Sequence, residues 1–501
     1  MPEGWARQFP ARWVPIAFLV IVLVDVAVFA PSWSHTVRGD HVAFLAETAR
    51  ESGWWAHVSK TWSWDRTRSF NTNATELFRP VQFGLLATET AVFGYRFVLW
   101  QLVGFAIHVL IVWRLFKLLL LVRPTVVAPL LALFFSVMLF PMEQVIWHHL
   151  HGYLLFSLIL VLLLEQVWRH ESEGQSSTKR FAAIAALVLV GCFTHEAMTG
   201  LALIVAGYLA WVHPVRTARR AVPLALLGAV AVYAVVSVID YRVRGCRPTP
   251  ELRGSFTIAG TAGNLAYTVV AWVAGGLWPA LLERIVNERL TLWPAKFLLS
   301  SRAVLYAVPG VFVAAVLAAF ATLARRGWSE TKPRWRFSAL AVAMMLGWAT
   351  LYAAGRFNAM GADLGVAYSP YYSYPVWLLL LIAAHALVDP LVLGRVGRTL
   401  LGAAFAASLV MNAGLTWQTN VHFARWSVQR ARVLAHVEEM IRAKAPSAEF
   451  EAFGRAKVEG NPPMHMLRFD ADPDRAFTLI EVLWPNRFPA WRRWSSTMGE
   501  R

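Results

Sequence analysis

Cysteine and charge are both scarce in this chain. Its 501 residues include 2 cysteines, Cys192 and Cys246, which excludes a disulfide framework and a zinc site built from cysteine pairs. Charged residues make up 15% of the chain, whereas about a quarter is typical of a soluble domain. So little charge over this length argues against a soluble globular fold.

Apolar residues take the place of the missing charge. They make up 57% of the chain, which also has 24 tryptophans, and they form long runs such as Trp13–Ala30 and Tyr153–Leu164. Such runs predict helices that cross a membrane, because a helix satisfies its own backbone hydrogen bonds in lipid. We therefore expect an all-α polytopic membrane protein. The net charge of +17 is interpreted as a result of topology and contact with anionic lipids, not of nucleic-acid binding.

The apolar pattern predicts about eleven transmembrane helices. The expected spans are 13–31, 97–121, 124–140, 151–168, 181–194, 197–212, 221–240, 303–324, 337–355, 371–388 and 399–417. We interpret the first as a retained span and not as a signal peptide, because no clear small-residue cleavage site follows it.

Lysine and arginine indicate the orientation of these spans. If the N-terminus is cytoplasmic, basic residues occur in every short inner loop, for example Arg7, Arg114, Arg169, Arg216, Arg325 and Arg395. This distribution follows the positive-inside rule. We expect an integral protein of a bacterial inner (plasma) membrane, with its C-terminus extracytoplasmic.

Two long outer segments are predicted within a transmembrane domain that covers residues 1–417. Residues 32–95 form the first, in which Arg79–Gly94 is interpreted as an interfacial helix, and residues 241–302 form the second. Residues 418–501 are expected to be a small extracytoplasmic appendage. Apolar residues at helical spacing near its start predict an amphipathic helix after the last span.

Acidic, imidazole and guanidinium side chains gather at the predicted outer ends of the spans. They are Asp40, His41, Arg79, Glu143, His148, His149, His151, His195, Glu196 and Arg356. Each has an alternative structural role, because helix ends are wet and polar residues occur there without function. Their coincidence on one side predicts a site at the outer membrane interface.

The stretch PMEQVIWHHLHG carries three of these histidines. If it is helical, His148 and His151 form a pair three residues apart, Glu143 joins His151 less closely, and His149 lies on another face. A divalent metal held by His148 and His151 stays open, although the HExxH motif is absent. The alternative is a pair of imidazoles that bond to loop carbonyls or lipid phosphates. No other cofactor is expected.

Five segments follow one another in order along residues 13–417. They are GDHVAFL, ELFRPVQFGLLATETAVFG, FPMEQVIWHHLHGYLLF, FTHEAMTG and SPYYSYPVWLLLL. Together they resemble the GT-C superfamily of polytopic glycosyltransferases, and within it the protein O-mannosyltransferase-like and tetratricopeptide-bearing branch. The chain departs from the family pattern at Asp40–His41, where paired acids are usual, and at His195, where lysine is usual. Its tail shows no clear tetratricopeptide repeat.

The resemblance implies transfer of a sugar from a polyprenyl-phosphate carrier to an acceptor at the outer face. Asp40 is the implied general base, and Arg79 and Arg356 are the implied partners of the lipid phosphate. The residues implied to orient the base or the acceptor are His41, Glu143, His195 and Glu196. The implied partners are the lipid-linked donor, membrane lipids and an acceptor of unknown identity, either a protein or an envelope glycan or lipid.

Two other functions stay open. A transporter or flippase would place ionisable residues near the membrane midplane, and the predicted spans contain Asp25, His108, Glu165 and His385. However, the two halves of the chain do not repeat. A non-catalytic scaffold would keep the fold and lack the chemistry.

Overall fold

The computed structural model describes most of the predicted spans. The described residues are 9–35, 78–94, 96–139, 141–172, 178–212, 221–244, 332–353, 372–387 and 395–443, with eight positions between 261 and 277. The predicted span at 303–324 and most of both outer segments lie outside these ranges.

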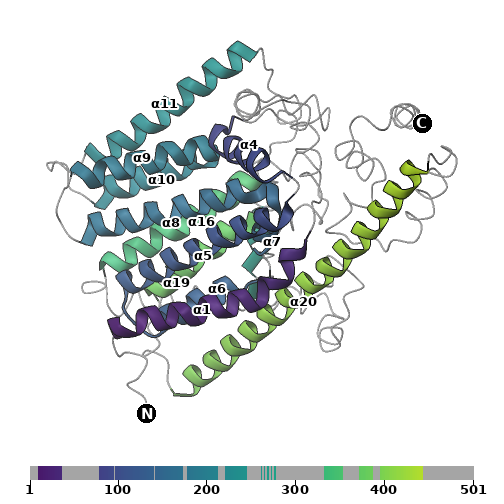
Figure 1. Ribbon diagram of the computed structural model, residues 1–501. Helices are drawn as coiled ribbons and strands as arrows, with labels where there is room; N and C mark the ends of the chain where they lie inside the picture. Colours follow the sequence, from purple (N-terminus) through teal and green to yellow (C-terminus); the bar gives the residue numbers. More distant parts are fainter. Residues whose placement is uncertain are drawn as a thin grey trace.

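The described elements are helices, most of them packed side by side as a bundle (Figure 1). The longer ones are α1 (Val14–Phe29), α5 (Phe97–Val122), α8 (His151–Ser172), α9 (Thr178–Thr194), α10 (Ala197–Val212), α11 (Ala221–Arg244), α16 (Lys332–Tyr352), α19 (Ser373–Leu387) and α20 (Arg395–Arg442). The shorter ones are η3 (Ala30–Ser34), α4 (Pro80–Phe93), α6 (Val127–Ser136), α7 (Glu143–Ile146) and η4 (His148–Leu150). The prediction of an all-α membrane protein is confirmed.

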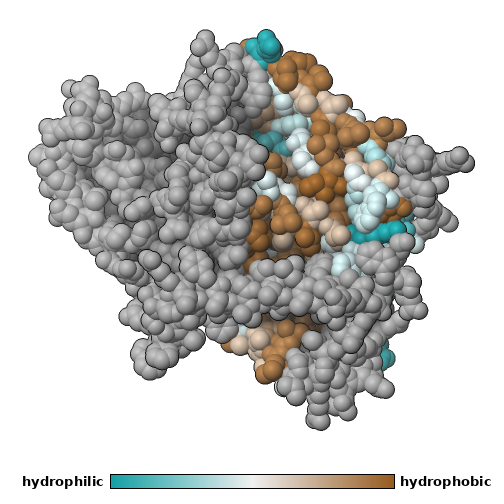
Figure 2. Space-filling view, turned by 180° about the vertical axis from the view of Figure 1, so that it is seen from behind, coloured by the Kyte–Doolittle hydropathy of each residue, from teal (hydrophilic) through white to brown (hydrophobic). Residues whose placement is uncertain are grey.

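Among the described residues, five helical stretches are long and apolar enough to cross a membrane. They are Ala11–Ser34, Phe97–Val122, His148–Ser172, Val222–Asp240 and Thr399–Arg425. Large apolar side chains are exposed on several of them, including Leu23 on α1 and Leu224 on α11. Figure 2 shows apolar side chains over much of the described surface on one face. A water-soluble protein would not leave so much apolar surface uncovered, whereas lipid accommodates it.

The predicted interfacial segment forms the short helix α4. Pro80 occupies its first turn, where the missing backbone N–H leaves no hydrogen bond unmade. Gly94 ends the helix with a φ of 50°, a conformation that favours glycine. Figure 1 shows α4 at one end of the bundle, and α7 lies at the same end.

The span predicted at 124–140 is corrected by the structure. Its helix, α6, ends at Ser136, and the chain then turns through α7 and η4 before α8 begins. Residues 134–138 and 141–146 are buried. Non-helical backbone is tolerated at membrane depth where protein covers it. No proline or glycine marks this helix end, so the cause lies in tertiary contacts.

Helix α20 continues beyond the span predicted at 399–417, without a break to Arg442. The expected boundary at residue 417 followed a fall in apolar content and not a helix-breaking residue. Residues 418–442 therefore extend the last helix and do not begin as a separate element.

Four polar residues on α20, spaced by four, hold the backbone of other segments. Asn412 Nδ2 donates to the Gly276 carbonyl at 2.9 Å, and its Oδ1 accepts from the Leu139 N–H at 3.1 Å. The other three side chains donate to backbone carbonyls: Ser408 to Leu277, Thr416 to Val137 at 2.9 Å, and Asn420 to Val28 at 3.0 Å. Asn412 and Thr416 satisfy backbone groups that the end of α6 leaves unpaired, and so they fix the turn after Ser136.

Candidate functional site

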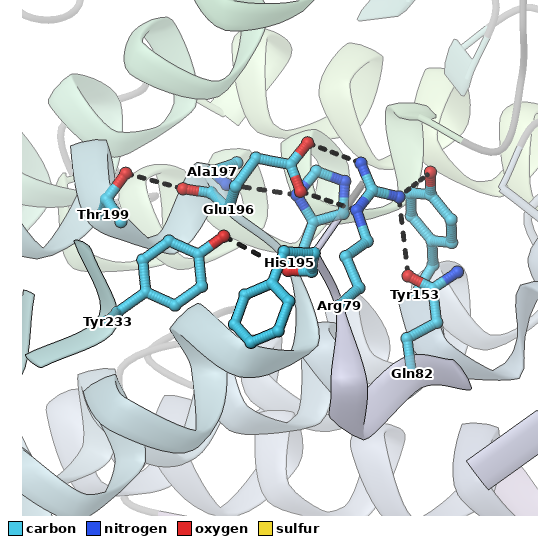
Figure 3. Close-up of polar contacts among 9 residues, drawn as sticks. Arg79, Gln82, Tyr153, His195, Glu196, Ala197, Thr199 and Tyr233 are labelled. Carbon is cyan, nitrogen blue, oxygen red and sulfur yellow. Dashed lines mark hydrogen bonds and ion pairs between the residues drawn. The ribbon is translucent and has the colours of Figure 1, made fainter. Parts of the chain in front are cut away.

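Charged side chains meet at the end of the bundle where α4 and α8 begin and where α9 joins α10. Arg79 immediately precedes α4, and Glu196 lies in the turn between α9 and α10. Tyr233 on α11 donates to the carbonyl of Phe78 at 3.3 Å, which anchors the chain just before Arg79. Figure 3 shows the side chains of Arg79 and Glu196 pointing toward one another.

Arg79 and Glu196 form a bidentate ion pair. Arg79 Nε donates to Glu196 Oε2, and one terminal nitrogen donates to Oε1, both at 2.6 Å. The second terminal nitrogen donates to the Tyr153 hydroxyl at 3.0 Å and lies 3.5 Å from Gln82 Oε1. The Arg79 side chain is 7% exposed, whereas that of Glu196 is 43% exposed. The pair therefore has a buried cation and an anion that solvent reaches.

The pair shifts the pKa of each partner away from its ordinary value. Desolvation alone would raise the pKa of Glu196, but the adjacent Arg79 guanidinium outweighs it and holds that pKa well below its usual range. Desolvation would lower the pKa of Arg79, and the Glu196 carboxylate instead raises it. Both groups are therefore charged throughout the neutral range. A carboxylate held this way stays ionised and is a weak base.

His195 lies beside this pair, in the same turn as Glu196. Its Nδ1 accepts the backbone N–H of Ala197 at 3.2 Å, so that nitrogen carries no proton. The ring packs against Tyr153 and Trp348, with centroid distances of 5.1 and 5.3 Å. Nδ1 also lies 3.7 Å from Glu196 Oε2. The predicted site residues His195 and Glu196 therefore belong to one cluster.

The face of α4 that carries Gln82 also carries Glu89, two helical turns later. Glu89 Oε1 pairs with His151 Nδ1 at 2.8 Å, and both side chains are almost fully buried. Helices α4 and α8 approach each other closely at Gly152. A Cβ added at this glycine would lie 2.2 Å from Gln82 Cγ. Helix α4 thus links the Arg79–Glu196 pair to the histidine stretch.

The geometry expected for PMEQVIWHHLHG is corrected. Its chain is not one helix, because α7 ends at Ile146, residues 148–150 form η4, and α8 starts at His151. His151 pairs with Glu89 and not with Glu143, which is buried in α7. Gln101 Nε2 donates to His148 Nε2 at 2.6 Å. The rings of His148 and His151 are neighbours, 6.4 Å apart.

The described residues contain no group of three or more histidine, cysteine, aspartate or glutamate side chains that could hold a metal. The predicted metal pair is placed by its hydrogen bonds: His151 Nδ1 bonds to Glu89, and His148 Nε2 bonds to Gln101. A metal held by this pair stays a prediction.

Three predicted site residues, Asp40, His41 and Arg356, lie outside the described residues. Sequence reasoning missed Glu89, Tyr153 and Gln101, which complete the two clusters. Glu89 had a detectable signal, since an acid in the apolar run of Arg79–Gly94 needs a partner. Tyr153 and Gln101 had none, because aromatic and amide side chains are common at helix ends.

Comparisons with solved structures find chains of similar fold. The chain is similar to the crystal structure of ArnT from Cupriavidus metallidurans bound to undecaprenyl phosphate, at 14% identity and a TM-score of 0.45. The match covers 95% of this chain and 89% of that one. No protein-family model and no curated protein matches. Likeness at this level establishes neither a family nor an activity for this chain.

Proposed function

We propose that the protein is a glycosyltransferase that moves a sugar from a polyprenyl-phosphate carrier to an acceptor at the outer end of the bundle. The observation that carries this proposal is the Arg79–Glu196 pair, a buried guanidinium whose counter-anion is 43% exposed. Charged groups buried at one end of an apolar bundle lower stability unless they are paired, and they concentrate at functional sites.

The charges of the Arg79–Glu196 pair suit the binding of a lipid phosphate. A phosphate that binds Arg79 would replace the Glu196 carboxylate with another anion, so the guanidinium stays paired throughout. Arg356 is the second proposed phosphate partner. A helix as short as α4 beside this site would let the carrier chain stay in lipid while its sugar reaches water.

The proposed reaction is a direct displacement. The acceptor hydroxyl attacks the anomeric carbon while Asp40 takes its proton, and the bond from that carbon to the phosphate oxygen breaks. The carrier phosphate leaves with the bonding electron pair, and arginine stabilises its charge. His41, Glu143 and His195 are proposed to orient the acceptor or the base.

A panel of radiolabelled polyprenyl-phosphate sugars tests this proposal with the purified full-length protein in nanodiscs. Release of free carrier phosphate with at least one donor is expected, together with about 100-fold loss in Arg356→Gln. Absence of turnover with every donor, despite carrier binding, would favour a non-catalytic scaffold.

Transport is the second candidate function, and one observation favours it. Asp25 and His108 are both buried inside the bundle, at 0% and 2% exposure. His108 hydrogen-bonds to Tyr374 and to the Ser136 carbonyl, and the other two candidate intramembrane groups also have partners. Glu165 pairs with Arg114 at 3.0 Å and Arg169 at 3.1 Å, and His385 hydrogen-bonds to the carbonyls of Leu119 and Arg123. Carrier flipping in proteoliposomes without sugar transfer would support this candidate.

A further inference from the structure

Asp25 is a buried carboxyl group on α1 that the proposed transfer does not use. Its exposure is 0%, and it lies inside the apolar stretch Ala11–Ser34. Neither of its oxygens forms a hydrogen bond within the described residues. A bare carboxylate in a membrane helix carries a large desolvation penalty, so its charge has to be neutralised.

Two hydroxyl groups from other helices face Asp25. It interacts with Ser136 at the end of α6 and with Tyr374 at the start of α19. Both are buried at 1% exposure. Phe135 packs edge-on against Tyr374, with ring centroids 4.9 Å apart, and Phe29 packs on His108 at 5.5 Å. Aromatic walls therefore enclose a small set of oxygen atoms.

Each of the two hydroxyl groups has another hydrogen-bond acceptor within reach. His108 Nε2 lies 3.1 Å from the Ser136 carbonyl, which can only accept, so Nε2 carries the imidazole proton. His108 Nδ1 must then accept, and the Tyr374 hydroxyl donates to it at 2.7 Å. The Ser136 hydroxyl donates to the Leu133 carbonyl at 2.9 Å.

Within the described residues, Asp25 therefore has hydroxyl groups near it and no cationic side chain. When the hydroxyl groups of Ser136 and Tyr374 donate to their other acceptors, their oxygens and the carboxylate would repel one another unless a positive charge lay among them. We propose that Asp25, Ser136 and Tyr374 form an intramembrane site for one monovalent cation, either a proton or Na⁺. One carboxylate and one such cation leave no net charge in the membrane, whereas a divalent ion would leave an uncompensated charge.

No described side chain near Asp25 supplies a positive charge that could neutralise it. The titratable groups that face Asp25 are Tyr374 on α19 and, behind it, His108 on α5. Helix α6 contributes the neutral Ser136. Helix α20 packs along α1, and its described titratable side chain, Arg425, is exposed. Oxygen ligands suit hard cations, which agrees with a proton or Na⁺.

Infrared spectroscopy and thermal unfolding of the full-length protein in nanodiscs test the site. In Na⁺-free choline buffer, we expect the carbonyl band of a protonated carboxylic acid, which Asp25→Asn removes. If Na⁺ binds, added NaCl removes that band and raises the Tm of the wild type only. If only a proton binds, the band persists in NaCl.

A second variant keeps the test decisive if Asp25→Asn does not fold. Tyr374→Phe removes one oxygen and keeps the ring, and it should weaken cation binding about tenfold or more. Asp240→Asn, on α11, is the control and should keep both the band and the salt response. An ionised Asp25 in Na⁺-free buffer, with no effect of Na⁺ on Tm, would overturn the proposal.

Discussion

Glu196 at the end of the bundle and Asp25 inside it present the same chemical group in two settings. Glu196 meets a guanidinium through two hydrogen bonds of 2.6 Å, and its side chain is 43% exposed. Asp25 is fully buried and meets no cationic side chain within the described residues. The first carboxylate is neutralised by the protein itself, whereas the second depends on something that comes from solution. The comparison separates a permanent ion pair from an exchangeable one.

Removal of the Glu196 charge should give the largest effect. Glu196→Gln leaves the Arg79 guanidinium buried without its anion, which should lower the free energy of unfolding by about 3 kcal/mol. This value lies at the low end of the range for buried pairs, because solvent reaches Glu196. Thermal unfolding in detergent measures the loss.

Two variants sharpen that result. Arg169→Gln removes a half-exposed partner of Glu165, which keeps Arg114, so its loss should stay below about 1 kcal/mol. The double variant Arg79→Met with Glu196→Gln should recover part of the loss, since neither charge is then unpaired. Equal losses in Glu196→Gln and Arg169→Gln would contradict a buried ion pair.

The polar row on α20 offers the next largest effect. Asn412→Leu leaves the Leu139 N–H and the Gly276 carbonyl unpaired, which should lower the free energy of unfolding by about 2 kcal/mol. Faster hydrogen exchange is expected in residues 137–147, which follow α6. The conservative Thr416→Val change removes a single hydrogen bond and should have about half that effect. Unchanged exchange in Asn412→Leu would mean that α20 does not hold this turn.

Acid should gradually weaken the stabilisation that the Arg79–Glu196 ion pair gives. Because the folded protein holds the pKa of Glu196 below its ordinary 4.5, the stabilisation is complete above that pH and is lost as the pH falls further. The slope from this group is at most about 1.4 kcal/mol per pH unit. Urea denaturation between pH 6 and pH 3 measures it. The Arg79→Met, Glu196→Gln variant should show a shallower slope, and equal slopes would assign the acid sensitivity to other groups.

Substitution of Asp25 by asparagine should have the smallest effect on the free energy of unfolding. Asp25→Asn removes no ion pair among the described residues, so the free energy of unfolding in Na⁺-free buffer should change by less than about 1 kcal/mol. Thermal unfolding in parallel with Glu196→Gln measures the contrast. A loss as large as that of Glu196→Gln would reveal a fixed counter-charge and would remove the distinction between the two carboxylates.

Sequence patterns predicted the helices well where apolar length decides the outcome. The spans at 97–121, 151–168 and 197–212 correspond to α5, α8 and α10, because about 20 apolar residues have few alternatives in lipid. The end of α6 was not predictable, since Asn412 and Thr416 fix it from far along the chain. Local propensity contains no information on such a contact.

The candidate site was predictable in outline and not in its pairing. Arg79, His195 and Glu196 were placed at one end of the bundle by topology, and the structure brings them together. No local sequence pattern indicated that Arg79 would pair with Glu196, 117 residues away, or that His151 would pair with Glu89. Those choices depend on how α4 packs on α8, which sequence periodicity does not determine.

Sugar transfer by Asp40→Asn is the most direct test of the proposed function, with Asp240→Asn as a matched carboxylate control. Both variants would be compared with the wild type in nanodiscs, at equal expression and equal binding of the polyprenyl-phosphate sugar. The proposal predicts that Asp40→Asn transfers sugar at least about 100-fold more slowly, because the acceptor loses its general base, while Asp240→Asn keeps the wild-type rate. Equal rates in the wild type and Asp40→Asn would contradict it.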